Sequence, residues 1–224
     1  MKTMQKTREK TRKLVVAGML SAVTMVLGLT PLGIIPIGPL NATILHVPVI
    51  IGAVLEGPVV GFVIGLIFGL FSLYRAAVGG SVLAPLFLNP VVTILPRVLI
   101  GPMAYYVFRG ISHLTRKRAL SVGAAAVAGT LTNTIGVMGL IFILYAQQYA
   151  DLMGISSQGV GLAILSASAV NGIPECILAA VVTVAVVLAV WKLTGSGPHS
   201  GEPHSGEPHT GSATPPERES PRKG

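Results

Sequence analysis

A single arginine, Arg97, lies in an otherwise apolar stretch of the chain at residues 89–108. A charge inside a membrane-spanning segment is costly, and it persists where it has a partner or lines a wet cavity. The planar guanidinium of arginine can hold a carboxylate through two parallel hydrogen bonds. Arg97 therefore predicts either a buried ion pair or a binding site for an acidic ligand.

Three further polar side chains are expected near the depth of Arg97. With a rise of about 1.5 Å per residue, Arg97 lies roughly 12 Å below the outer membrane face and Asn133 roughly 9 Å below it. Asn171 and Glu175 are one helical turn apart on one face, at the outer start of the last predicted span. These groups come from distant parts of the sequence, so their convergence predicts a polar pocket open to the outside.

Two interpretations of this cluster stay open. In the first, Arg97 forms an ion pair with Glu175, while Asn133 and Asn171 link helices through hydrogen bonds. In the second, Arg97 binds the carboxylate of a substrate. Glu175 would then orient Arg97 or accept protons from hydroxyl and amide groups.

The loop at residues 30–46 is expected outside the membrane, and its three prolines and two glycines prevent a continuous helix. Its leucines and isoleucines predict that it packs over the top of the bundle as a lid. Asn41 and Thr43 would then offer hydrogen bonds to a ligand beneath. His46 is a further candidate, although a loop histidine more often forms local hydrogen bonds. A plug that simply closes the bundle is the alternative.

Motifs for catalysis and for metal binding are absent from the sequence. The chain contains no Walker A, GxSxG or HExxH motif and no pair of intramembrane aspartates. Its single cysteine, Cys176, excludes an internal disulfide and a cysteine-based metal cluster. We therefore expect no enzyme activity, no catalytic residue, no metal site and no cofactor.

The elements that must position these residues are membrane-spanning helices. Of the 224 residues, 51% are hydrophobic and 11% are charged, and the mean hydropathy is +0.74. Several apolar runs reach the roughly 20 residues that cross a hydrocarbon core. We predict an all-α, polytopic bundle of six transmembrane helices with a long extracellular loop between the first two. The predicted spans are residues 14–29, 47–55, 59–73, 89–108, 119–145 and 174–193, and a tight turn at residues 56–58 joins the second to the third.

Lysine and arginine gather at residues 1–13 and 109–118, whereas the predicted outer loops contain only Arg75. This asymmetry predicts a multi-pass protein of a prokaryotic plasma membrane with both termini in the cytoplasm. It also explains the net charge of +8 without nucleic-acid binding. We expect the span at residues 14–29 to be retained rather than cleaved as a signal peptide.

We expect the chain to be divided into three regions. They are a basic cytoplasmic N-terminus at residues 1–13, a membrane substrate-binding domain at 14–194 and a cytoplasmic tail at 195–224. The tail repeats Gly, Pro and His with a period of five residues, a composition that predicts disorder. His199, His204 and His209 recur in it. Weak metal binding by these histidines and an accident of repeat expansion are the two explanations.

The first span contains two pairs of small residues at a spacing of four: Ala17 with Ser21, and Gly18 with Ala22. Such pairs let two helix backbones approach closely. They predict either packing within the bundle or a docking face for another membrane protein.

Several segments, in this order, are similar to those of a known family. They are AGMLSA at residues 17–22, HVPVIIGAVLEGPVVGFVIGLIFGLFS at 46–72, NPVVTILPRVLIG at 89–101 and TLTNT at 130–134. Over about residues 13–193 the chain resembles the substrate-binding S components of energy-coupling factor (ECF) vitamin transporters. The resemblance implies a six-helix bundle that captures a vitamin from outside and topples in the membrane to release it.

The resemblance also implies partners: a membrane coupling (T) subunit and two cytosolic ATPases, docked through Gly18 and Ala22, although Gly18 replaces the usual alanine. The loop with Asn41, together with Arg97 and Asn133, looks similar to the pantothenate-specific members. A thiamin precursor, folate and a cobalamin-related compound remain open as alternative substrates, although few aromatic residues (5%) are available to stack on flat rings.

A self-sufficient secondary carrier is the alternative from another class of protein. It predicts mid-membrane carboxylates and inverted repeats, and the sequence contains neither.

Overall fold

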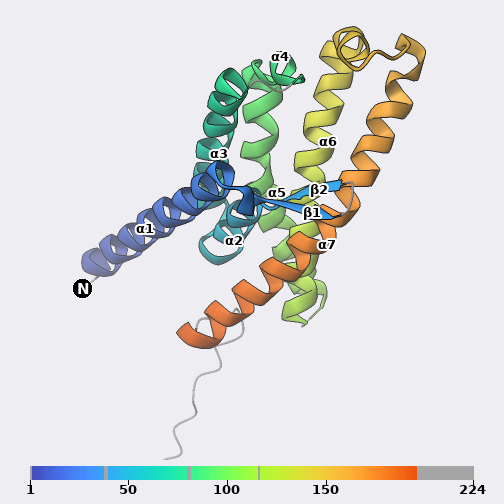
Figure 1. Cartoon of the computed structure of the whole chain (residues 1–224). Coiled ribbons are helices and arrows are strands. Elements are labelled where there is room, and N and C mark those ends of the chain that lie inside the picture. The colour runs from blue at the N-terminus through green and yellow to red at the C-terminus, as the bar shows by residue number, and fades with distance from the viewer. Residues whose placement is uncertain (1, 38–39, 80–81, 116, 196–224) are drawn as a thin grey trace, which may run out of the picture.

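The computed structural model describes residues 2–37, 40–79, 82–115 and 117–195. Long helices dominate the fold, and a short antiparallel hairpin follows the first of them (Figure 1). The elements are α1 (Lys2–Leu29), η1 (Pro31–Gly33), β1 (Ile34–Ile37), β2 (Leu40–Thr43), α2 (Val47–Glu56), α3 (Pro58–Val78), α4 (Ala84–Phe87), α5 (Pro90–Leu114), α6 (Arg118–Met153), η2 (Ser157–Gly159) and α7 (Val160–Thr194). The tail predicted to be disordered, with its three histidines, lies outside the described residues beyond position 195.

Five of the described helices, α1, α3, α5, α6 and α7, are long and apolar enough to cross a membrane. The prediction of an α-helical, multi-pass membrane protein is thereby confirmed. The remaining predicted span, the second at residues 47–55, corresponds to α2, which has only 10 residues. A helix of that length covers about 15 Å, roughly half of a hydrocarbon core.

Helix α2 is buried inside the bundle. All eight residues from Val47 to Val54 are buried, as expected for a helix that is apolar on every side. It ends at Glu56, and α3 begins at Pro58. Between them Gly57 has a φ of 99°, a conformation that glycine adopts without steric cost. The predicted tight turn is therefore present.

Helix α7 begins earlier than predicted. We expected the last span to start at Pro174, but α7 runs from Val160 through Pro174 to Thr194. A proline is tolerated inside a membrane helix where neighbouring groups satisfy the freed carbonyl, so Pro174 does not mark a boundary. Asn171 and Glu175 therefore lie well inside α7 and not at its start. Helix α6 also continues past the predicted end, with non-helical dihedral angles at Tyr145.

The loop after α1 forms a hairpin rather than an irregular segment. Strands β1 and β2 pair with Ile34 opposite Thr43 and Ile37 opposite Leu40. Figure 1 shows the hairpin reaching from the end of α1 across to the middle of α7. The predicted lid thus lies part-way along the bundle instead of over its top, because the strongly tilted α1 ends at that level (Figure 1).

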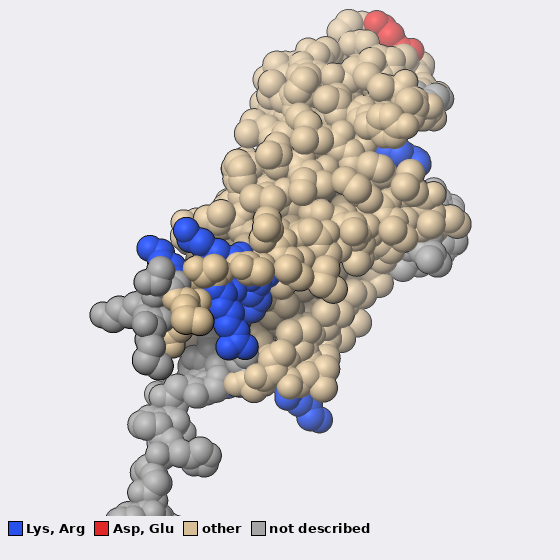
Figure 2. Space-filling model, turned by 90° about the vertical axis from the view of Figure 1, so that its left-hand side faces the viewer, with Lys and Arg blue, Asp and Glu red and all other residues tan. Residues whose placement is uncertain are grey.

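The core consists of two hydrophobic clusters. One includes Ile50, Ile100 and Ala126, and the other includes Val92 and Ile141. Along α5 and α6 the two clusters are separated by a layer that contains Arg97 and Asn133. The outer surface is mostly uncharged: Figure 2 shows a broad tan face, with most lysines and arginines in its lower half. This arrangement fits a protein surrounded by lipid.

Three glycines on α3 bring it into close contact with α5: Gly61, Gly65 and Gly69, at a spacing of four residues. A Cβ atom added to Gly65 would collide with the backbone carbonyl of Arg97, and one added to Gly61 would approach Gly101. Small residues at this spacing let membrane helices approach closely. The glycines on α3 therefore fix the backbone that carries Arg97.

Candidate functional site

Two adjoining cavities occupy the polar layer between the two core clusters. The first, of about 330 Å³, brings together polar residues from four elements; we call it the amide cavity. Its lining includes Thr43 of β2, Arg97 of α5, Asn133 of α6, and Asn171 and Glu175 of α7. The sequence predicted that the last four of these residues would converge and that Thr43 would lie in a lid above them. The structure places all five around one cavity.

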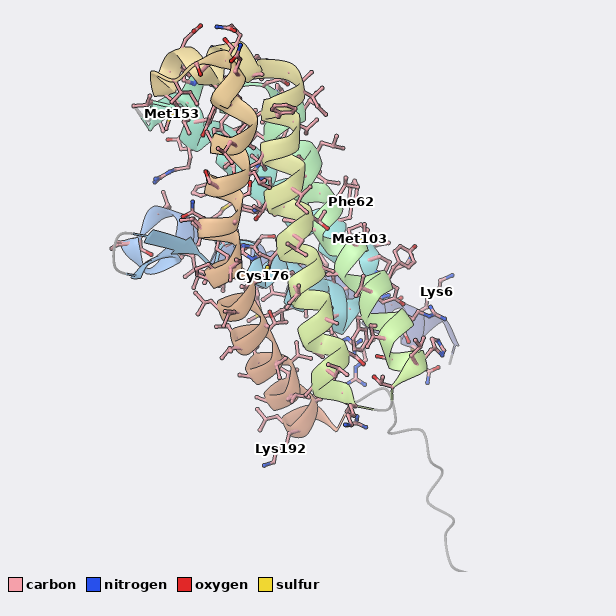
Figure 3. The ribbon with its side chains drawn as sticks, turned by 90° about the vertical axis from the view of Figure 1, so that its right-hand side faces the viewer. Lys6, Phe62, Met103, Met153, Cys176 and Lys192 are labelled. Carbon is pink, nitrogen blue, oxygen red and sulfur yellow. The ribbon has the colours of Figure 1, made fainter. Side chains whose placement is uncertain are left out.

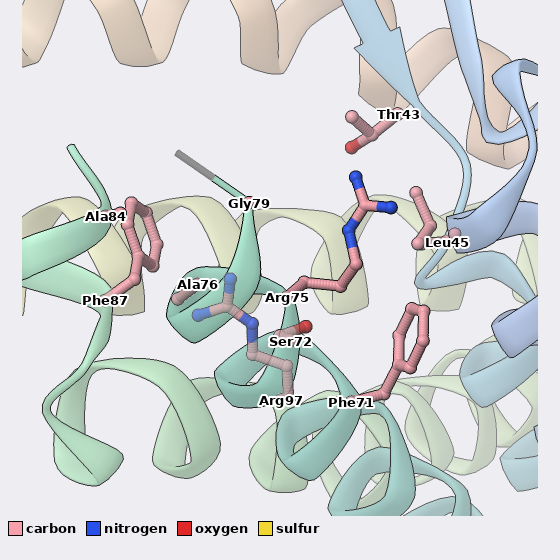
Figure 4. A pocket seen from close by; sticks show the side chains of 11 residues that line it. Thr43, Leu45, Phe71, Ser72, Arg75, Ala76, Gly79, Ala84, Phe87 and Arg97 are labelled. Atoms are coloured by element: carbon pink, nitrogen blue, oxygen red, sulfur yellow. The ribbon is translucent and has the colours of Figure 1, made fainter. Parts of the chain in front are cut away.

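The second cavity, of about 290 Å³, shares Thr43, Phe87 and Arg97 with the first. It extends toward the end of α3, where Ser72 and Arg75 also line it. Figure 4 shows the side chains of both arginines at this cavity. We call it the arginine cavity. Because Arg97 borders both spaces, one ligand can contact groups in both.

Within the described part of the chain, Arg97 is held in place by groups other than a carboxylate. Its side chain is buried, with 8% exposure, and Nη1 donates to the carbonyl of Val92 at 3.1 Å. That carbonyl is free because Pro96, four residues later, has no N–H to donate. The rings of Phe68 and Phe87 flank the guanidinium at 5.8 Å each, a geometry that stabilises a cation. The remaining guanidinium N–H groups, with Nε unpartnered and buried, are available to an anion.

Glu175 does not pair with Arg97. Among the described residues, the ion pair within 4.0 Å is that of Arg12 with Glu56. Oε1 of Glu175 instead accepts two hydrogen bonds from Thr43, from the backbone N–H at 3.0 Å and from Oγ1 at 2.8 Å. The carboxylate therefore ties β2 to the middle of α7.

The two asparagines differ in how they are satisfied. Asn171 donates from Nδ2 to the carbonyl of Ala167 in its own helix at 3.0 Å. Oδ1 of Asn133 is buried without a hydrogen-bond partner. A buried acceptor without a partner is unfavourable, so Asn133 can accept from a hydroxyl or amide of a ligand. Neither asparagine links two helices in the described structure.

His46 lies apart from the cavities. The His46 ring is 1% exposed, and Nε2 lies 2.9 Å from Oγ1 of Thr130. Since that hydroxyl donates to the carbonyl of Ala126, we assign the shared proton to Nε2 of His46. His46 thus lines neither cavity and anchors the loop to α6. Asn41 pairs with Pro36 in the hairpin register, and its side chain lies outside the described part of the structure.

Arg75 was not among the predicted site residues. The sequence could have indicated a role for Arg75, because it is the single lysine or arginine between Lys13 and Arg97. Phe68 and Phe87 were also missed, because an aromatic residue in an apolar helix does not indicate which cation it will contact.

The two small-residue pairs of α1 face in different directions. Ala17 and Ser21 are buried, with 6% and 5% exposure, so they pack inside the bundle. Gly18 and Ala22 are exposed. A Cβ atom added to Gly18 would meet no atom within 4 Å.

The sequence model of a transporter family, described as ECF transporter, substrate-specific component, matches residues 12–187, which is most of the chain. The chain belongs to this family. As an ECF substrate-specific component it is part of a membrane transport system and is not an enzyme.

Two related proteins support the assignment to the ECF components. The chain is 32% identical to the pantothenic acid transporter PanT of Lactococcus lactis over 168 residues, covering 69% of this chain and 80% of that protein. It is 29% identical to the pantothenate transporter PanT of Leuconostoc mesenteroides over 187 residues, covering 79% of this chain and 91% of that protein. The expected resemblance to ECF components is confirmed.

Proposed function

We propose that this ECF component binds pantothenate and delivers it for uptake across the plasma membrane. The observation that carries the proposal is Arg97, a buried cation at the junction of two cavities that has no carboxylate partner among the described residues. The names of the two relatives point to the same ligand.

Pantothenate has a carboxylate at one end and a secondary amide and two hydroxyls toward the other. The carboxylate would bind Arg97 through charge-assisted hydrogen bonds. Oδ1 of Asn133 would accept from a hydroxyl or from the amide N–H, and Glu175 would accept from a hydroxyl with its remaining lone pairs. Val137 and Met138 give the amide cavity an apolar wall for the methyl groups. Asn171 and Thr43 would complete the polar contacts.

The proposal also includes the orientation of the protein in the membrane and the subunits with which it assembles. Both termini face the cytoplasm, because lysines and arginines favour that side. Lys6 and Lys192 lie away from Met153, which marks the turn between α6 and α7 (Figure 3). The five long helices, with the short α2 inside, would form the substrate-binding domain at residues 14–194. A coupling (T) subunit would dock on Gly18 and Ala22, and two cytosolic ATPases would supply the energy.

Binding of labelled pantothenate to purified protein tests the proposal. Arg97→Gln should lower the affinity about 10- to 100-fold, since a hydrogen bond to a charged group contributes about 1.5–3 kcal/mol. Arg109→Gln is the matched control, because Arg109 is exposed and its side chain contacts Tyr105. Thermal unfolding of each variant would show whether the fold is retained. Undiminished binding by a folded Arg97→Gln variant would contradict the proposal.

A further inference from the structure

The arginine cavity contains two positive charges without an acidic side chain. Arg75 and Arg97 are the charged residues among its described lining, and the other polar side chains are Ser72 and Thr43. Like charges at one small cavity repel each other, and low-dielectric walls strengthen the local field. The cavity therefore attracts an anion.

The two arginines differ in burial. Arg97 is 8% exposed, whereas Arg75 is exposed to solvent. Figure 4 shows the Arg75 side chain extending from the end of α3 toward Thr43 and Leu45, with the Arg97 side chain on the other side of Ser72. Arg75 thus marks the mouth of the cavity, and Arg97 marks its interior.

A purely structural role for Arg75 would be to offset the partial negative charge at the end of α3, since Arg75 lies in the last turn of that helix. In that role the guanidinium would contact the last carbonyls of the helix. Among the described residues Arg75 has no side-chain hydrogen bond or ion pair, and its side chain extends toward Thr43 and Leu45 (Figure 4). The side chain is therefore directed at the cavity.

We propose that Arg75 is a second anion-binding residue, which receives the carboxylate of the substrate at the mouth of the arginine cavity before it reaches Arg97. This inference rests on the proposed binding of a carboxylate-bearing substrate. Ser72, one turn before Arg75 on α3, can donate a hydrogen bond along the same path. Arg75 would accelerate capture, and Arg97 would retain the ligand.

The association and dissociation rate constants of labelled pantothenate separate these roles. At low ionic strength, Arg75→Gln should lower the association rate constant about tenfold and change the dissociation rate constant less than about twofold. In about 1 M salt, where the Debye length is about 3 Å, the difference should largely disappear. Arg75→Lys should keep most of the wild-type rate, because it keeps the charge. Arg97→Gln should instead raise the dissociation rate constant.

Pantothenol, in which an alcohol replaces the carboxylate, is the matched neutral ligand. Its association rate constant should be the same in the wild type and in Arg75→Gln. The inference is overturned if Arg75→Gln binds pantothenate at the wild-type rate in low salt, or if it slows pantothenol equally. If the wild-type protein does not bind pantothenate at all, the proposed function fails first and the inference fails with it.

Discussion

At the scale of single residues, the site is organised by a cation that is held by carbonyl and aromatic groups instead of a carboxylate. Pro96 frees the carbonyl of Val92 for Arg97, and Phe68 and Phe87 flank the guanidinium. These groups hold the charge in position but do not neutralise it. A buried charge without a counter-ion is costly, so an anionic ligand that enters the cavity would be stabilised there.

The contact between Thr43 and Glu175 leads to a prediction about ligand release. Two hydrogen bonds hold β2 against α7, and both residues line the amide cavity. Thr43→Val keeps the shape of the side chain and removes the hydroxyl donor. It should raise the dissociation rate constant of pantothenate about 2- to 10-fold, since one hydrogen bond contributes about 0.5–1.5 kcal/mol. Washout of labelled ligand measures this rate.

Thr132→Val is the matched control, because Oγ1 of Thr132 donates to the carbonyl of Ala128 in its own helix. Combining Thr43→Val with Glu175→Gln should give less than the sum of the two single effects, because both changes disrupt one contact. Fully additive effects would show that the two residues act independently on the ligand.

Some positions in the site could be predicted because they depend only on distance along a helix, whereas others depend on how separate elements pack together. Depth along a helix follows from residue number, so Arg97 and Asn133 were expected at similar levels. Glu175 was also expected nearby, although α7 begins before its predicted start. Glu175 still lines the same cavity as Asn133, because α6 likewise continues past its predicted end and the two helices are both longer on that side. Its contact with Thr43 could not be predicted, because it depends on where the hairpin lies in three dimensions.

At the scale of elements, the close contact between α3 and α5 positions the site. Gly61 and Gly65 on α3 face Gly101 and the backbone of Arg97 on α5. The glycine spacing was visible in the sequence, but a similar spacing occurs on α1, where one pair is buried and the other is exposed. Spacing alone therefore indicates close packing without naming the partner helix.

This contact predicts that Gly65→Ala disturbs the site. The added Cβ would collide with the carbonyl of Arg97, and backbone atoms cannot move aside as the end of a flexible side chain can. We expect a loss of about 1–3 kcal/mol in the free energy of unfolding, as for overpacking elsewhere, together with weaker pantothenate binding. Thermal unfolding and equilibrium binding on the same sample would measure both effects.

Gly110→Ala on α5 is the control, because an added Cβ there meets no atom within 4 Å. It should be neutral or slightly stabilising, by up to about 1 kcal/mol, since alanine favours a helix more than glycine does. Equal effects of the two substitutions would mean that α3 and α5 are not packed as closely as the structure indicates.

At the scale of the whole molecule, α1 has two faces with different surroundings. Ala17 and Ser21 face the bundle, and Gly18 and Ala22 face away from it. The ion pair of Arg12 with Glu56, at 3.0 Å, connects α1 to the turn between α2 and α3. Because Arg12 is 61% exposed, this pair contributes little to stability by itself. The exposed small residues therefore leave room for another helix on the side of α1 that faces away from the bundle.

Substrate binding and partner docking should consequently be separable by substitution. Gly18→Leu and Ala22→Leu should leave pantothenate affinity and thermal stability unchanged. They should lower uptake at least about tenfold in liposomes that contain the coupling subunit and the ATPases, because bulky side chains prevent close approach of helix backbones. Gly139→Leu on α6 is the control, since an added Cβ there also meets no atom within 4 Å. Its uptake should match the wild type. Loss of binding in the α1 variants would assign that face to the bundle, and normal uptake would place the docking surface elsewhere.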